Sequence, residues 1–379
     1  MIRRDFIRKS TIAGTSALWV GASSRIWGAN DAVVLGMIGT GGRGQRLLKG
    51  LSNIPGYRVA AVCDLREDRV NRAREIGQET WPHINTYTDF HKLLEKEKID
   101  ACFIATEEGN HAKCVVPVLE AGLHCFSEKP VDITVEKVDL VVKTARKAKG
   151  IYQVGFQRRY VPGIRKAIDH VHDGKMGKVT FLQGMWQWTE GVSGRYLDMA
   201  LSGCWFLAQA CHHSDAMMWV MKDQPPLRCA AMGVITDQHE NPPAYCAEDH
   251  SALMFEFPGG VIYSYTHLMN CCQPFTGEKL WIYTEKGGID LVTGIKYPRP
   301  GMGEPEPIGE KSPDWDYGTY QELEAFAHHI RNHEKPLSNV ETARLSTLMS
   351  ILGWKAMYRW EKKKFEPSLV TWNDLGSTT

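Results

Sequence analysis

The sequence predicts an α/β domain with a doubly wound parallel sheet, followed by an α+β domain with a large, open and mostly antiparallel sheet. Between residues 33 and 154, short apolar runs alternate with amphipathic stretches, which is the pattern of parallel strands joined by helical crossovers. From about residue 156, longer strand-like stretches replace this alternation. A chain of 379 residues is long enough for two domains that each bury a core.

The predicted elements follow the chain in that order. The strands expected in the first half are 33–38, 57–63, 99–105, 124–126 and 151–154, and the helices are 47–51, 66–77, 87–96, 113–121 and 135–147. In the second half we expect a helix at 162–172 and strands at 179–188, 251–257, 261–267 and 279–284, with Pro-rich loops at 224–226, 241–245 and 297–307. Helices are predicted at 321–331 and 341–364, and the last one is expected to pack back on the first domain.

Residues 1–30 are predicted to be an export signal. Arg3 and Arg4 precede an uncharged run at 11–24, and this order resembles a twin-arginine signal peptide. The run is shorter than the roughly 20 apolar residues of a spanning helix, so no stable membrane anchor is expected. The sequence therefore predicts the twin-arginine export machinery as a partner and a periplasmic or otherwise exported protein. Ala22 and Ala29 are alternative cleavage points, and a disordered N-terminus of a cytosolic protein is the competing interpretation.

Composition narrows the partners and the redox chemistry. Lys and Arg number 45 against 44 Asp and Glu, so no global field attracts nucleic acid. Among ten cysteines, Cys63 and Cys102 lie in apolar runs and Cys271 adjoins Cys272, which predicts small buried side chains rather than disulfides. Free thiols fit an export route that carries folded proteins.

A glycine motif points to a dinucleotide. Gly39, Gly41 and Gly44 form G-x-G-x-x-G directly after the first strand and before a helix, the context of the Rossmann fold. The first glycine permits the tight turn, the second lets pyrophosphate approach the backbone, and the third lets the helix pack on the strand. The sequence therefore predicts a nucleotide-binding domain over residues 31–155 and a substrate and oligomerisation domain over 156–379.

The end of the second strand indicates which dinucleotide binds. Asp64 lies 25 residues after Gly39, where a carboxylate accepts hydrogen bonds from the ribose hydroxyls of the adenosine half. Arg66 is the opposing signal, because a guanidinium there accommodates a 2′-phosphate. Since Asp64 would repel that phosphate, NAD is favoured over NADP.

Further short motifs follow along the chain: Ala105-Thr106, Asn110-His111 and Glu128-Lys129-Pro130 in the first domain, and the stretches at 157–162 and 174–179 in the second. In order and spacing, the first three resemble the first-domain signature of the family of glucose-fructose oxidoreductase, inositol dehydrogenase and MocA, and the two stretches resemble its second-domain landmarks. The resemblance covers nearly the whole mature chain. Taken with the glycine motif, it predicts these cofactor-binding residues: Gly39, Thr40, Gly41, Gly42, Arg43, Gly44, Asp64, Arg66, Thr106, Asn110, His111, Glu128, Lys129 and Gln157.

The resemblance also implies the catalytic residues. It implies a cis peptide before Pro130 that brings Lys129 to the nicotinamide, where an ammonium group can stabilise the developing alkoxide and relay its proton. The family's second catalytic element is Asp, three residues, His, two residues, Asp on one helix. Here His212 and Asp215 match, but the first Asp is Ala208, which leaves His212 as the expected acid and base.

The remaining substrate candidates surround that element. The predicted substrate-binding residues are Arg158, Tyr160, Trp205, His213 and Asp215, and Trp186, Trp188 and Trp205 are candidates to stack on a sugar ring or to pack in the core. Of the neighbouring Arg158 and Arg159, one is expected to contact substrate and the other to be structural. No metal is expected, because the adjacent residues His212 and His213 point about 100 degrees apart on a helix.

Three functions fit these observations. The first is a sugar or polyol oxidoreductase whose NAD does not dissociate, because an exported enzyme meets no pool of cofactor. The second, which the family also allows, is an NAD-dependent glycosidase that oxidises C3 transiently, with Tyr196 or His213 as the extra base. The third is a non-catalytic sensor of NAD and sugar, against which the presence of Lys129 and His212 argues. A homodimer or homotetramer is expected, since the open second sheet commonly pairs between subunits in this family.

Overall fold

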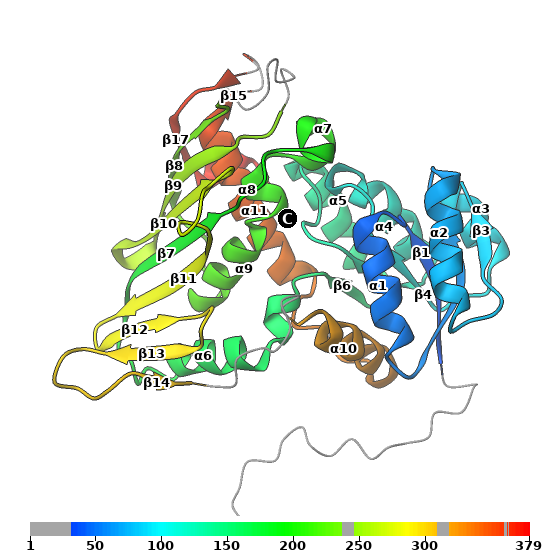
Figure 1. Cartoon of the computed structure of the whole chain (residues 1–379), viewed down its shortest axis with the longest axis horizontal. Helices are drawn as coiled ribbons and strands as arrows, with labels where there is room; N and C mark the ends of the chain where they lie inside the picture. The colour runs from blue at the N-terminus through cyan, green and yellow to red at the C-terminus, as the bar shows by residue number, and fades with distance from the viewer. Residues whose placement is uncertain (1–31, 237–245, 309–317, 360–361, 363) are drawn as a thin grey trace, which may run out of the picture.

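The computed structural model describes residues 32–236, 246–308, 318–359, 362 and 364–379. It contains two large sheets, with helices between and around them, and a third sheet of two short strands (Figure 1). The predicted signal at 1–30, including Ala22 and Ala29, and the predicted loop at 241–245 lie outside the described residues.

The first sheet has six strands, all parallel, in the order β3-β2-β1-β4-β5-β6. Its strands are β1 (Val33–Ile38), β2 (Tyr57–Cys63), β3 (Asn85–Tyr87), β4 (Ala101–Ile104), β5 (His124–Ser127) and β6 (Tyr152–Val154). The chain order reverses between β1 and β4, so a crevice for a ligand is expected at the carboxyl ends of these two strands. This order confirms the predicted doubly wound fold.

Helices cover both faces of this sheet. They are α1 (Gly42–Ser52), α2 (Glu67–Gln78), α3 (Phe90–Lys96), α4 (His111–Glu120) and α5 (Val135–Ala145). Apolar residues of α1 and α2 bury one face together with those of α10 (Thr319–Asn332), whereas α3, α4 and α5 bury the other. The helix α10 therefore belongs in space to the first domain, although it lies late in the sequence.

The second sheet has nine strands in the order β14-β13-β12-β11-β7-β10-β9-β8-β17. Its strands are β7 (Val179–Gln187), β8 (Arg228–Val234), β9 (His250–Phe257), β10 (Val261–Leu268), β11 (Gly277–Thr284), β12 (Gly287–Asp290), β13 (Ile295–Pro298), β14 (Glu306–Pro307) and β17 (Ser368–Thr371). Only the β7–β10 pair is parallel, so the predicted open and mostly antiparallel sheet is confirmed.

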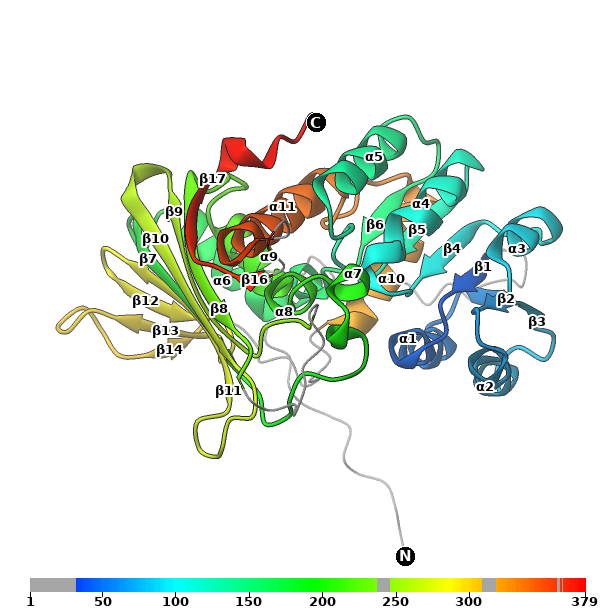
Figure 2. The same ribbon diagram turned by 90° about the horizontal axis from the view of Figure 1, so that it is seen from above.

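Among the described residues, helices cover one face of the second sheet and none lies on the other (Figure 2). The covering helices are α6 (Pro162–His172), α8 (Trp205–Ala208), α9 (Cys211–Val220) and α11 (Val340–Met357), and the short α7 (Met199–Ser202) lies nearer the first domain. The helix α11 contacts α9 and β8 on one side and α5 and β6 of the first domain on the other. It therefore joins the two domains.

Two helix predictions were wrong. The expected single helix through Ala208 and His212 is broken into α8 and α9 at Gln209 and Ala210, where tertiary hydrogen bonds to the break replace helical ones. The helix predicted at 341–364 ends at Met357, because the chain turns extended at Tyr358 and pairs there with Phe365 in a two-stranded sheet, β15 (Tyr358–Arg359) and β16 (Lys364–Phe365). The strands β3, β8 and β12–β17 were not predicted.

The cysteine prediction holds with one correction. All ten cysteines are free thiols and eight are buried, but Cys271 is only half-buried and Cys272 is exposed. Cys272 is thus not the small buried side chain that the sequence suggested. Within the part of the chain that the structure describes, no helix is both long and apolar enough to cross a bilayer.

Candidate active site

The glycine turn between β1 and α1 has the shape of a phosphate cradle. Gly39 has a φ of +88°, and a Cβ there would lie 2.6 Å from the carbonyl carbon of Ala105. A Cβ on Gly44 would lie 2.2 Å from the Gly39 carbonyl oxygen, so both positions require glycine. At Gly42 a Cβ would meet nothing within 4 Å. The N-terminus of α1 is therefore open where pyrophosphate would approach, and the residues fit a dinucleotide.

Asp64 directly follows β2, beside this turn. One carboxylate oxygen accepts the backbone N–H of Thr40 at 2.8 Å, and the other accepts that of Arg66 at 3.0 Å. These bonds hold the carboxylate in place for ribose hydroxyls. The guanidinium of Arg66 pairs with Asp68 on the surface, whereas that of Arg69, which the sequence analysis did not single out, lies 3.9 Å from Asp64.

Two predicted cofactor residues pair with each other. Nε of Arg43, on α1, donates to Oε1 of Glu128 at 2.6 Å, and its Nη2 donates to Thr319 at 3.2 Å. Burial alone would raise the pKa of Glu128, but the cations of Arg43 and Lys129 lower it below its ordinary value. This ion pair holds α1 against the loop after β5 and so fixes the backbone position of Lys129.

Lys129 is held by both domains. The Lys129–Pro130 peptide is cis, as the resemblance implied, and Nδ1 of His111 donates to the Pro130 carbonyl at 2.7 Å. The Lys129 ammonium group donates to the carbonyl oxygen of Ala208 at 2.7 Å. The break between α8 and α9 makes that carbonyl available, so a backbone oxygen holds the lysine at the position where the resemblance implies an aspartate.

His212 lies one turn beyond, at the start of α9, and its side chain is buried. Within the described residues, its Nδ1 has no hydrogen-bond partner. Burial and the nearby cations of Lys129, Arg158 and Arg43 lower its pKa well below the ordinary value. The imidazole is therefore neutral at neutral pH and can accept a proton.

His213, the neighbour of His212, belongs to a buried cluster of charged side chains. Oε1 of Glu278, on β11, lies 2.6 Å from Nε2 of His213 and 2.5 Å from Nη1 of Arg158. Although burial opposes it, Arg158 and the hydrogen bond from His213 lower the pKa of Glu278 to about 2. Trp186 stacks on His213 with ring centroids 5.5 Å apart. Glu278 is thus an unpredicted member of the site, and only its place in the sheet reveals it.

Three predicted substrate residues are used for packing instead. Asp215 is buried and accepts hydrogen bonds from Arg159 at 2.9 Å and from Ser346 at 2.8 Å. The buried Tyr160 hydroxyl lies 3.2 Å from that of Ser338. Trp205 is buried between two rings, at 5.1 Å from Tyr196 and 4.8 Å from His267. These contacts correct the predicted substrate roles of Asp215, Tyr160 and Trp205, because all three side chains are buried and the Asp215 carboxylate and the Tyr160 hydroxyl already have partners. They make Arg159 the structural arginine of its pair.

The remaining predicted cofactor residues line the edge between the two domains. Thr106 follows β4, and the amide of Asn110 donates to Glu107 at 3.5 Å. Gln157 begins the 3₁₀ turn η3 (Gln157–Tyr160), and its buried Oε1 has no partner among the described residues. Unpartnered buried oxygens are costly, so Gln157 has a free acceptor for a ligand.

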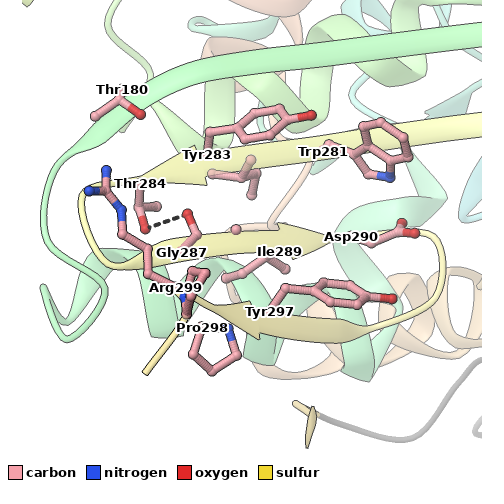
Figure 3. Close-up of a pocket in the computed structure, with 13 residues that line it drawn as sticks. Thr180, Trp281, Tyr283, Thr284, Gly287, Ile289, Asp290, Tyr297, Pro298 and Arg299 are labelled. Carbon is pink, nitrogen blue, oxygen red and sulfur yellow. Dashed lines mark hydrogen bonds between the residues drawn. The ribbon is translucent and has the colours of Figure 1, made fainter. Parts of the chain in front are cut away.

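A separate pocket lies on the second sheet. It is lined by β11, β12 and β13 and has a volume of about 500 Å³ (Figure 3). None of the predicted site residues lines it; Trp281, Tyr283 and Tyr297 do. The chemistry expected of Lys129 and His212 is therefore not located in that pocket. Within the described residues, no group of three or more His, Cys, Asp or Glu side chains could hold a metal ion.

Comparisons with known proteins show which proteins the chain is similar to. The chain is 23% identical over 340 residues to the myo-inositol 2-dehydrogenase of Thermotoga maritima, covering 87% of this chain and 97% of that protein. It is 30% identical over 161 residues to a glycosyl hydrolase family 109 protein of Saccharopolyspora erythraea, covering 41% and 35% of the two chains. Alignments with three further curated relatives span 54–58% of those proteins.

Solved structures share the fold. The scyllo-inositol dehydrogenase of Lactobacillus casei, with bound NAD(H) and scyllo-inositol, matches with a TM-score of 0.71 and 19% identity, covering 90% of this chain and 99% of that one. The model of the oxidoreductase family with an NAD-binding Rossmann fold matches residues 33–156, and that of the GFO/IDH/MocA C-terminal domain matches residues 164–290. The chain therefore belongs to the GFO/IDH/MocA family of NAD-binding oxidoreductases.

Proposed function

We propose that the protein oxidises a CH–OH group of a cyclic polyol or sugar with NAD that stays bound between turnovers. The observation that carries the proposal is the meeting of Lys129, from the nucleotide domain, with the α8–α9 break that precedes His212. The relatives named as inositol dehydrogenases support a cyclic polyhydroxy substrate.

Lys129 and His212 have different roles in the removal of the hydroxyl proton. When bound, NAD supplies the two-electron acceptor for the carbinol carbon. Lys129, a cation, donates a hydrogen bond to the reacting hydroxyl and stabilises the negative charge that develops on its oxygen. His212 is neutral, and its imidazole accepts the proton. No carboxylate is needed at position 208, because the Ala208 carbonyl orients the lysine.

The test is a substrate screen on the purified protein as isolated, without added cofactor. We expect inositols or sugars to reduce the bound nicotinamide, seen as reduced-nicotinamide absorbance, and a ketose or inosose to reoxidise it. A protein that binds NAD but is reduced by no polyol or sugar would overturn the proposal and favour a sensor.

A glycosidase is the second candidate, and the family 109 relative is the observation that favours it. That chemistry needs a base for the C2 proton. Burial raises the pKa of Tyr196 above its ordinary value, and His213 is buried with its Nε2 hydrogen directed at Glu278, so neither is well placed. Incubation with aryl glycosides in D₂O distinguishes the two functions, because deuterium at C2 of a released sugar occurs only with elimination.

We propose that residues 1–30 direct export through the twin-arginine pathway with NAD already bound. The Arg3-Arg4 pair and the uncharged run behind it support this proposal. Fractionation of a bacterial host should find the processed protein outside the cytoplasm, and an Arg3→Lys, Arg4→Lys double variant should remain inside. Equal export of that variant would contradict the twin-arginine route.

We also propose that the uncovered face of the second sheet pairs with a second copy of the chain. Met232, Met254 and Leu369, on β8, β9 and β17, are 61%, 55% and 58% exposed there. Apolar side chains this exposed on a neighbouring set of strands are typical of an interface. Light scattering should show a dimer or tetramer, and Met254→Lys should lower the mass. An unchanged mass would exclude this face.

A further inference from the structure

A segment of the second domain crosses to the nucleotide domain at the edge where the cofactor is expected. The strap, defined as residues 193–203, includes the 3₁₀ turn η4 (Gly194–Leu197) and α7. It lies on η2 (Glu108–Asn110), the turn between Thr106 and His111. Both flanking residues are predicted cofactor residues, so the strap rests on the part of the nucleotide domain that is expected to contact NAD.

One ion pair fastens the strap to that turn. Nε of Arg195 donates to Oε2 of Glu108 at 2.9 Å, and its Nη2 donates to Oε1 at 2.9 Å. Glu108 is buried, so it is fixed in the nucleotide domain. A bidentate guanidinium–carboxylate pair of this kind fixes orientation as well as distance.

The backbone packs as closely as the side chains do. A Cβ on Gly109 would lie 2.8 Å from the carbonyl oxygen of Ala200 and 3.1 Å from that of Leu201. Glycine is therefore needed for α7 to sit against η2. This close approach shows that the contact between strap and turn is a fitted surface and extends beyond one ion pair.

The strap also reaches the reacting edge. Nη2 of Arg195 donates to the Tyr196 hydroxyl at 2.8 Å, and that hydroxyl accepts a hydrogen bond from Gln209. Gln209 lies in the α8–α9 break, between Ala208 and His212. One chain of contacts thus runs from Glu108 through the strap to the residues that hold Lys129.

We propose that the strap retains the cofactor: NAD leaves only when the contact between Arg195 and Glu108 opens, and the two residues position the strap without touching the reacting atoms. The inference rests on the proposed function, since it explains how the NAD stays bound between turnovers. It assigns the retention of NAD to the contact between Arg195 and Glu108.

The experiment measures release of NADH from the full-length mature enzyme by the loss of its fluorescence on dilution into excess NAD. We expect Arg195→Ala and Glu108→Gln each to speed release at least tenfold, and Arg195→Lys to have a smaller effect. If the residues act as a pair, the double variant should release no faster than either single variant.

A matched control is available at another contact between the domains. Arg146, after α5, donates twice to Glu341 of α11, at 2.8 Å and 2.8 Å, away from η2. Arg146→Ala should leave release unchanged. Equal acceleration by Arg146→Ala, or no acceleration by the Arg195 and Glu108 variants while each stays folded by circular dichroism, would overturn the inference. Rapid release from the wild-type enzyme would instead contradict the retention of NAD in the proposed function, and the ratio of rates still tests the strap.

Discussion

The cradle at 39–44 and the reacting edge around Lys129 are expected to bind one cofactor and its substrate by different means. The cradle is a contiguous stretch whose glycines act through backbone shape: Gly39 and Gly44 have no room for a side chain. The reacting edge is assembled from side chains on three separate segments, and each needs its own support. Lys129 depends on His111 and Ala208, and His212 depends on the α8–α9 break. A local motif therefore predicts the first region fully and the second only in part.

The sharpest test of this division is Lys129→Met. Because the methionine keeps the length of the side chain and loses the cation, we expect kcat to fall by about 10³-fold, within the range of general acid–base and electrostatic catalysis. NAD affinity should stay within about threefold, since the cradle supplies the binding. Single-turnover reduction and calorimetry measure the two quantities. A parallel loss of NAD affinity would break the division.

The buried ion pair that supports the reacting edge should contribute to the free energy of unfolding. Asp215→Asn removes the carboxylate that pairs with buried Arg159, and Asp223, 3.5 Å away, compensates only in part. We expect the free energy of unfolding to fall by about 3 kcal/mol, the lower end for a broken buried pair. Asp173→Asn, in a surface pair with Lys175, should have a much smaller effect, because solvent screens an exposed pair. Urea denaturation measures both, and similar losses would contradict a buried structural role.

His212→Gln should lower kcat by about 100-fold, because the proton acceptor is lost while Lys129 still polarises the hydroxyl. The direction in which kcat/KM changes with pH follows from the lowered pKa of His212. The pKa of His212 is lowered, so the folded protein keeps the imidazole neutral as pH falls below the ordinary value of about 6.5. In the wild type, kcat/KM should hold at pH 6.5 and fall only at lower pH. If the decrease of kcat/KM on the acid side had its midpoint at or above pH 7, His212 would be excluded as the base.

The sequence predicted both sheets and the glycine turn at 39–44, because each leaves a local pattern of apolar period or glycine spacing, whereas the roles that it gave to Asp64 and Lys129 stay predictions. It did not predict Glu278 or the contact of Arg195 with Glu108, which depend on residues far apart in the chain. It assigned Asp215 to substrate because position in a motif does not report burial. It also missed the helix break at Gln209, where hydrogen bonds from Lys129 and to Tyr196 compete with helical propensity.

The smallest expected effect concerns the choice of dinucleotide at the cradle. Asp64 is held by two backbone N–H groups, so Asp64→Asn should keep the turn and lose only the charge and acceptor strength offered to the ribose. We expect the Kd for NAD to rise about tenfold, or about 1.4 kcal/mol. The Kd for NADP should fall, because the repulsion of a 2′-phosphate disappears while Arg69 remains 3.9 Å away.

Asp68→Asn is the control for that change. It removes the surface partner of Arg66 and leaves Asp64 untouched, so it should change neither Kd if Arg66 stays outside the cofactor site. Calorimetric titration of both variants with both dinucleotides separates the contributions of the two residues. Tighter NADP binding by Asp68→Asn alone would assign the discrimination to Arg66, and the cradle would then depend on a mobile surface side chain as well as on backbone shape.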